Sequence, residues 1–295
     1  MVKRPIGLTG RVLLRLGVTW IGRSALAADA PSCGDCHDQS KTFAANPHGR
    51  AACELPGDAA CASCHGDGKA HMEAGGDKSL IRGLHGAKGS EACLKCHDVT
   101  TEHTSFRDGV HGATEAVNCL TCHSIHTPVA KERKLLAKTQ TKLCGSCHQG
   151  QTGSMESKAY VHHLDRGGFT CATCHDPHGR KGEGMLKLTR QGDLPCLKCH
   201  NEKRGPYVFE HVGPTVSAMP GGCLSCHEPH GSNNPKMLTR SNVTQLCLEC
   251  HSMMGTSGVG SQPPATHNIQ LPRWRNCTTC HVAVHGSNRS PKLLK

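Results

Sequence analysis

Aromatic side chains make up only 3% of this chain of 295 residues, and hydrophobic residues only 36%. Glycine and proline are frequent, with 34 and 16 copies, and no stretch has the alternating pattern of a strand. Such a chain buries too little apolar side chain to offset the entropy of ordering it. We therefore predict a mostly irregular fold with short α-helices, whose core is supplied by something other than side chains.

Long apolar runs are also missing, apart from residues 12–22 near the amino terminus. That run follows Lys3 and Arg4, is interrupted by arginines, and precedes a cluster of small residues. This order predicts a cleaved signal peptide over 1–27 and an exported chain over 28–295. No other stretch reaches the length of a membrane-spanning helix, so we expect a soluble protein that does not insert itself into a membrane.

Cysteine is abundant, with 21 copies, and 20 of them lie in a Cys-x-x-Cys-His motif that occurs ten times. Zinc sites and thioredoxin-like sites also use CxxC pairs, but neither requires a histidine after every pair. The motif predicts ten covalent c-type haems, with thioethers from both cysteines and an iron ligand from the histidine. The cysteines are Cys33, Cys36, Cys61, Cys64, Cys93, Cys96, Cys119, Cys122, Cys144, Cys147, Cys171, Cys174, Cys196, Cys199, Cys223, Cys226, Cys247, Cys250, Cys277 and Cys280. The histidines are His37, His65, His97, His123, His148, His175, His200, His227, His251 and His281.

Ten haems would supply the apolar surface that the side chains lack. We therefore expect a haem-dominated core and an apoprotein that is largely unfolded. Cys53 is the one cysteine outside the motifs. Its role stays open between a free thiol and a link to a partner.

The motifs form a repeat, because the odd-numbered and the even-numbered ones each recur about every fifty residues. This period predicts an elongated molecule of five two-haem repeats. We also expect short helices over 139–148 and 241–251, which run into motifs. The repeats span roughly 33–92, 93–143, 144–195, 196–246 and 247–295.

Thirteen histidines lie outside the motifs. Each even-numbered motif has one of them upstream and one downstream, which gives ten candidate distal iron ligands for ten irons. His85 and His103 are surplus in this scheme, the choice between His162 and His163 stays open on spacing, and the haem that each histidine serves is not specified. The candidates are His48, His71, His111, His126, His162, His178, His211, His230, His267 and His285.

Irons with two imidazole ligands have no open position for a substrate. We therefore expect electron relay and not catalysis. The formal charge of +11 falls to +6 without residues 1–27, and we interpret the remaining basic residues as partners of haem propionates. No nucleic-acid partner is expected.

The last hundred residues resemble a known family. Its signature lies in Cys199-His-Asn-Glu-Lys-Arg-Gly-Pro206 with Glu210-His211, in Cys223-Leu-Ser-Cys-His-Glu-Pro-His-Gly-Ser232, and in Cys280-His-Val-Ala-Val-His-Gly-Ser-Asn288. These segments are similar to the periplasmic decahaem cytochromes of the MtrA/DmsE type.

The resemblance implies a row of closely packed bis-histidine haems within an outer-membrane β-barrel. Such a row would pass electrons between periplasm and cell exterior, in contact with partner cytochromes. The resemblance also favours His162 over His163. The short segment before Cys33, together with Cys53, His85 and His103, departs from the family pattern.

Three functions follow from these observations. The first is a conduit through the outer membrane, formed with a porin-like barrel. The second is a periplasmic shuttle, or a subunit that feeds a reductase, and the third is a multihaem reductase. The direction of electron flow, the haem potentials and the terminal donor or acceptor depend on partners.

Overall fold

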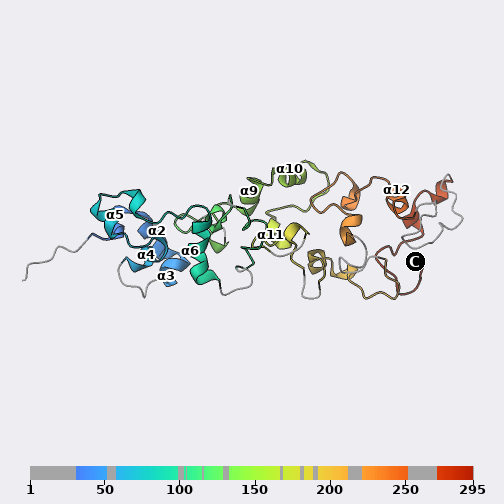
Figure 1. The fold of residues 1–295 in the computed structure, drawn as a ribbon. Coiled ribbons are helices and arrows are strands. Elements are labelled where there is room, and N and C mark those ends of the chain that lie inside the picture. The colour runs from blue at the N-terminus through green and yellow to red at the C-terminus, as the bar shows by residue number, and fades with distance from the viewer. Residues whose placement is uncertain are drawn as a thin grey trace, which may run out of the picture.

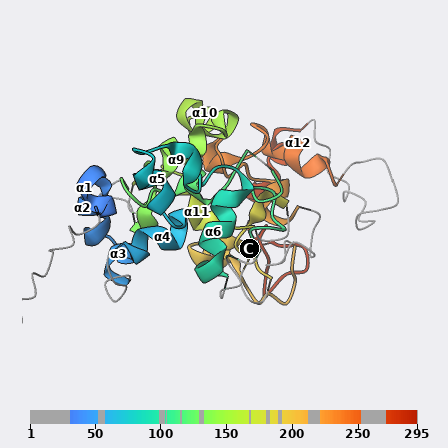
Figure 2. The same cartoon turned by 60° about the vertical axis from the view of Figure 1, so that its left-hand side comes forward.

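The computed structural model describes residues 31–51, 58–98, 103, 105–114, 116–128, 133–166, 169–179, 183–188, 192–211, 221–251 and 271–294. The expected signal segment 1–27, Cys53 and His267 lie outside these residues. The described segments follow one another in chain order along one long axis (Figure 1). After a turn about the vertical axis, α1, α2 and α3 still lie at one end and α12 at the other (Figure 2). This is the elongated shape that the repeat predicts.

The amino-terminal part contains most of the α-helices. Up to residue 97 these are α1 (Cys33–Cys36), α2 (Gln39–Ala45), α3 (Pro47–Ala51), α4 (Ala59–His65), α5 (Lys69–Glu73) and α6 (Ala87–His97), with the 3₁₀ turn η1 (Lys78–Leu80). They are followed by α8 (Cys119–Cys122), η2 (Arg133–Leu135), α9 (Gln140–Gly145), α10 (Gln149–Ser157) and α11 (Cys171–Cys174).

The carboxyl-terminal part is built mostly from 3₁₀ turns. These are η3 (Glu183–Met185), η4 (Pro195–Lys198), η5 (Asn201–Lys203), η6 (Gly222–Ser225), η7 (Pro235–Met237), η8 (Pro272–Trp274) and η9 (Cys277–Thr279), with α12 (Val243–Leu248) among them. The helices expected over 139–148 and 241–251 are therefore present as the shorter α9 and α12. The side chain of Asn242 fixes the start of α12, because it accepts hydrogen bonds from two backbone amides of its first turn.

The described residues contain no β-sheet, in agreement with the lack of a strand pattern. Backbone pairing is limited to isolated antiparallel bridges. They join His123 with Leu136, Tyr160 with Ser232, His175 with Leu186, Phe209 with Ser287, and His227 with Leu238.

Buried apolar side chains are few. Among the described residues, the large buried ones are Leu94, Phe106, Leu194 and Leu197. Such a small apolar core is what the composition predicts. No helix in the described segments is both long enough and apolar enough to cross a membrane.

Candidate haem sites

Each motif lies on a turn of helix. In eight motifs the backbone amide of the histidine donates to the carbonyl of the first cysteine at 2.9–3.0 Å, and the other two motifs end α4 and α6. Residues three and four apart on a helix share one face. The turn therefore presents both thiols and the imidazole in one direction, as covalent haem attachment requires. Polar residues begin several of these turns: the side chain of Asn118 accepts from the amide of Thr121, and Asn276 from Thr278.

The motif histidines face spare histidines at a regular distance. Metal–imidazole bonds of about 2 Å place two imidazoles on opposite sides of one metal with ring centroids about 6.3 Å apart. Nine motif histidines have a spare histidine at 5.8–6.5 Å, which fits an iron held between each pair. The pairs are His37–His71, His65–His126, His97–His48, His123–His178, His148–His111, His175–His230, His200–His162, His227–His285 and His251–His211.

The pairing follows a rule that spacing along the chain does not reveal. Among the described residues, the spare histidines around an even-numbered motif do not face that motif. The downstream one faces the preceding even-numbered motif, as His178 faces His123. The upstream one faces the following odd-numbered motif, as His162 faces His200. Only His71 lies opposite the first motif of its own repeat.

Backbone carbonyls hold the upstream spare histidines in place. Nδ1 of His111 lies 3.0 Å from the carbonyl oxygen of Pro177, Nδ1 of His162 lies 3.1 Å from that of Pro229, and Nδ1 of His211 lies 2.8 Å from that of Val284. Each carbonyl belongs to the residue just before a downstream spare histidine. We call these places interlocks, because each ties one repeat to the next. A carbonyl on Nδ1 fixes the tautomer and leaves Nε2 free to bind a metal.

A fourth place of this kind lies nearest the amino terminus, where the segment of His48 meets the segment of His126. We call it the first interlock, and it differs from the other three. There the side-chain amide of Asn46 donates to the carbonyl of Ile125 at 2.6 Å, in the place where a histidine donates elsewhere. The side-chain oxygen of Asn46 accepts from the amides of His48 and Gly49. Nδ1 of His48 is therefore buried without a hydrogen-bond partner, and Nδ1 of the neighbouring His126 has none either.

Four of the five even-numbered motif histidines have carbonyl partners of their own. Nδ1 of His123 lies 2.7 Å from the carbonyl oxygen of Lys134, and Nδ1 of His227 lies 2.9 Å from that of Lys236. Both lysines have left-handed backbone angles, with φ of 63° and 60°, which turn the carbonyl toward the ring. His175 and His281 make the same contact, with Gly184 and Lys292. The similar linkers after these motifs thus make the same contact four times.

Burial keeps several of these histidines neutral. It lowers the pKa of His48, His126, His230, His251 and His285, and the positive charge of neighbouring groups lowers each of these pKa values further. Neutral imidazole is the form that binds a metal. The electrostatic environment therefore suits iron ligands.

The cysteines link the motifs in chain order. Interaction with the thiol of Cys93 lowers the pKa of Cys119 to about 6, and interaction with Cys144 and with Cys196 lowers the pKa of Cys171 and of Cys223 to about 7. Second cysteines approach the next repeat, since Cys122 lies close enough to Cys147 for their charges to interact. Attachment points of consecutive haems are therefore adjacent.

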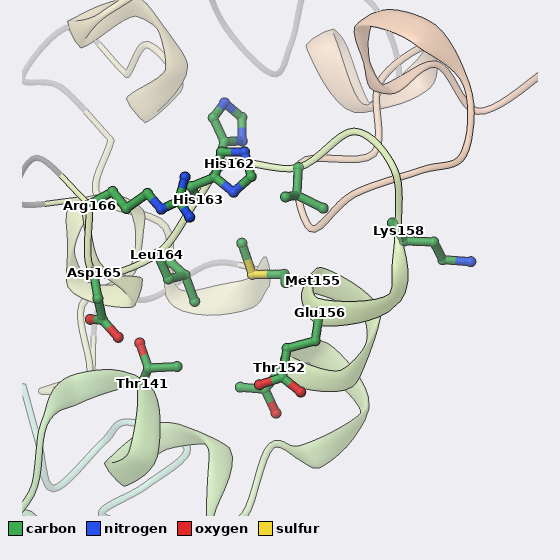
Figure 3. Close-up of a pocket in the computed structure, with 11 residues that line it drawn as sticks. Thr141, Thr152, Met155, Glu156, Lys158, His162, His163, Leu164, Asp165 and Arg166 are labelled. Carbon is green, nitrogen blue, oxygen red and sulfur yellow. The ribbon is translucent and has the colours of Figure 1, made fainter.

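A cavity of about 380 Å³ lies beside His162 and His163. Figure 3 shows the two histidines and Arg166 at one end and Thr152 with Glu156 at the other. His162 also stacks on Phe169 at 5.2 Å. Among the contacts of the described residues, it is His162 and not His163 that lies opposite a motif histidine.

Sequence reasoning located the spare histidines but missed their supports. The carbonyls of Pro177, Pro229 and Val284 carry no side-chain signal, although proline before histidine occurs in two of these interlocks. The role of Asn46 was also missed. Its place two residues before a spare histidine is the one signal that could have indicated it.

Comparison with known proteins gives two matches. The doubled CXXCH motif family matches residues 111–153, 162–205 and 217–256. The multiheme cytochrome MtrA of Shewanella baltica (strain OS185) is 33% identical over 248 residues, which cover 80% of this chain and 70% of that protein. The motifs and this relative together indicate covalently bound haem c.

Proposed function

Because the chain belongs to the MtrA family of multihaem c-type cytochromes, which transfer electrons, we propose that it relays electrons along ten bis-histidine haems in chain order. The observation that carries this proposal is the set of nine facing imidazole pairs, each at 5.8–6.5 Å, in segments that follow one another along the long axis. Haem c supplies reversible one-electron chemistry at its iron. The protein supplies the spacing and the orientation of the ligands.

The proposed ligands are the ten motif histidines and the spare histidines opposite them. The nine pairs use nine of the ten motif histidines and nine of the ten distal candidates predicted from the sequence. The remaining motif histidine is His281 and the remaining candidate is His267, so we assign His267 to the tenth iron by count. His162 is the ligand at the seventh motif, and His163 is not a ligand. With both axial positions taken at every iron, the protein acts as a relay and not as an enzyme.

Adjacent attachment points support a continuous relay. The first cysteine of an odd-numbered motif interacts with the first cysteine of the next motif, and second cysteines interact with those of the next repeat. Thioether bonds at these cysteines would bring the edges of neighbouring haems close together. A continuous row of this kind is useful where electrons must travel a distance.

We place this relay in the periplasm, associated with the outer membrane. There it would pass electrons through a porin-like β-barrel partner to or from cytochromes on the other side. The elongated form suits a barrel lumen (Figure 1). The family implies the same setting.

Two experiments test these assignments. The purified oxidised protein should contain ten covalent haems, all low-spin. Fewer haems, or a substantial high-spin fraction, would contradict the ligand assignment. Liposomes that hold the protein with its cognate barrel should then allow an internal donor to reduce an external oxidant, and neither component alone should. Co-purification with a periplasmic reductase and no barrel binding would favour the shuttle.

A further inference from the structure

His103 lies outside the pairing described above, yet it contacts two of the proposed ligands. Its ring centroid lies 5.5 Å from that of His97 and 5.2 Å from that of His178. Both separations are shorter than those of the nine ligand pairs. Two imidazoles joined by an N–H···N hydrogen bond of about 2.9 Å have centroids about 5.2 Å apart. The separations therefore fit direct contact, whereas the ligand pairs leave room for a metal.

The two contacted histidines belong to consecutive haems. His97 is the motif histidine of the third haem, and His178 lies opposite the motif histidine of the fourth. His178 has a second polar neighbour, since the buried carboxylate of Asp176 lies 3.8 Å from its Nδ1. His103 therefore completes the polar surroundings of one ligand and touches a ligand of the neighbouring haem.

The third haem is also where the usual support is missing. At the fifth, seventh and ninth haems the spare histidine has a carbonyl on Nδ1, but Nδ1 of His48 has no partner, because Asn46 occupies the carbonyl of Ile125. Among the odd-numbered motifs, a histidine six residues after the motif histidine occurs only at the third. The extra imidazole of His103 thus lies at the third haem, where the spare histidine lacks the carbonyl partner on Nδ1 that it has at the fifth, seventh and ninth haems.

We propose that His103 is a positioning residue, which fixes the imidazole planes of His97 and His178 and so sets the ligand fields of the third and fourth haems. This inference rests on the proposed bis-histidine relay. Contacts to the outer side of a ligating histidine orient the ring and tune its basicity, and both affect the electronic state of the metal. His103 itself binds no iron.

The test uses the full-length holoprotein and three variants. His103→Ala removes the contact, His103→Gln keeps a polar group of similar reach, and His85→Ala removes the other surplus histidine, which is exposed. Haem content, spin state and the electron paramagnetic resonance of the ferric haems are measured for each. We expect ten low-spin haems in every protein. His103→Ala should shift the g values of two haems in ten, His103→Gln should retain most of the wild-type signal, and His85→Ala should match wild type.

Each other outcome identifies what is wrong. Unchanged g values in His103→Ala would overturn the inference and leave the relay intact. A high-spin haem in His103→Ala would make His103 a ligand. Equal, shifted spectra for His103→Ala and His103→Gln would contradict a positioning role that a polar group of similar reach can take over. A wild-type protein with fewer than ten low-spin haems would instead contradict the proposed relay itself.

Discussion

The first interlock and the last one bring histidines to the same separation by different means. At the first, His48 and His97 lie 5.8 Å apart among α2, α3 and α6, and Asn46 holds the backbone. At the last, His211 and His251 lie 6.0 Å apart, and Nδ1 of His211 bonds a carbonyl beside a bridge between Phe209 and Ser287. The spare histidine thus lies opposite a motif histidine in both interlocks. Its Nδ1 has a hydrogen-bond partner only in the last one.

This difference separates two tasks of a ligand's surroundings. Packing and backbone geometry place Nε2, whereas the group on Nδ1 sets how strongly the ring donates to a metal. We expect the histidines of the first interlock to be weaker donors than those of the later ones. The haems that they serve should then be easier to reduce.

The largest expected effect concerns a feature that the regions around the first and the last interlock share, which is their small number of buried apolar side chains. Among the described residues, the large buried apolar side chains are Leu94 and Phe106 in one region and Leu194 and Leu197 in the other. A chain made without haem attachment should therefore lack a cooperative thermal transition in circular dichroism, and proteases should cut it throughout. The holoprotein is the control. A haem-free chain in which either region resists proteolysis would show that this region has a core of its own.

The next effect concerns ligation in each region. His48→Ala and His211→Ala should each convert about one haem in ten to a high-spin form, because both rings lie opposite a motif histidine. Optical and paramagnetic resonance spectra measure the fraction. His163→Ala serves as the control and should leave all haems low-spin. If His48→Ala stayed fully low-spin while His211→Ala did not, the first interlock would not supply a ligand.

The sequence was sufficient for the motifs, the spare histidines and the sparse helices, because each depends on residue type and local spacing. CxxCH specifies its own turn of helix, and Asn242 is a recognisable cap. Pairing across the row was not predictable. The facing histidines are 34 to 61 residues apart in the chain, and all described pairs except His37–His71 cross from one repeat to the next.

The supports escaped prediction for a related reason. Any residue can present a backbone carbonyl. Pro177 and Val284 therefore make the same contact with a spare histidine although their side chains differ, and no sequence motif identifies them. Asn46 breaks the repeated pattern through a side chain that happens to reach Ile125. Such long-range contacts follow from how extended segments lie together, and composition and periodicity contain little information about them.

A smaller effect is expected from a substitution that makes the first interlock resemble the others. Gly109 lies two residues before His111 in the second interlock, where a side chain would collide with Gly179. Asn46→Gly should likewise free the carbonyl of Ile125 for Nδ1 of His48. One added hydrogen bond of about 1 kcal/mol, if felt by the ferric state alone, lowers a one-electron potential by about 40 mV.

Potentiometric titration of Asn46→Gly should therefore show one haem that is harder to reduce. Asn201→Gly, which changes an asparagine in the exposed turn η5, is the control and should leave the titration unchanged. The same substitution at Asn46 also removes the bonds to the amides of His48 and Gly49, so some loss of thermal stability is expected. A rise in potential would contradict the idea that the carbonyl, once free, finds the imidazole.

The smallest effect concerns surface charge. The regions around the first and the last interlock each have an exposed ion pair. Lys41 pairs with Asp38 at 2.8 Å in one, and Arg240 pairs with Glu249 in the other, and all four side chains are largely exposed. Water and salt screen such pairs, whose contribution in proteins ranges from nothing to about 1 kcal/mol. Asp38→Asn and Glu249→Gln should therefore leave the thermal transition and the haem titration of the holoprotein unchanged within error, at low and at high salt. A change in potential with Glu249→Gln alone would mean that surface charge, and not the partner on Nδ1, distinguishes the two regions.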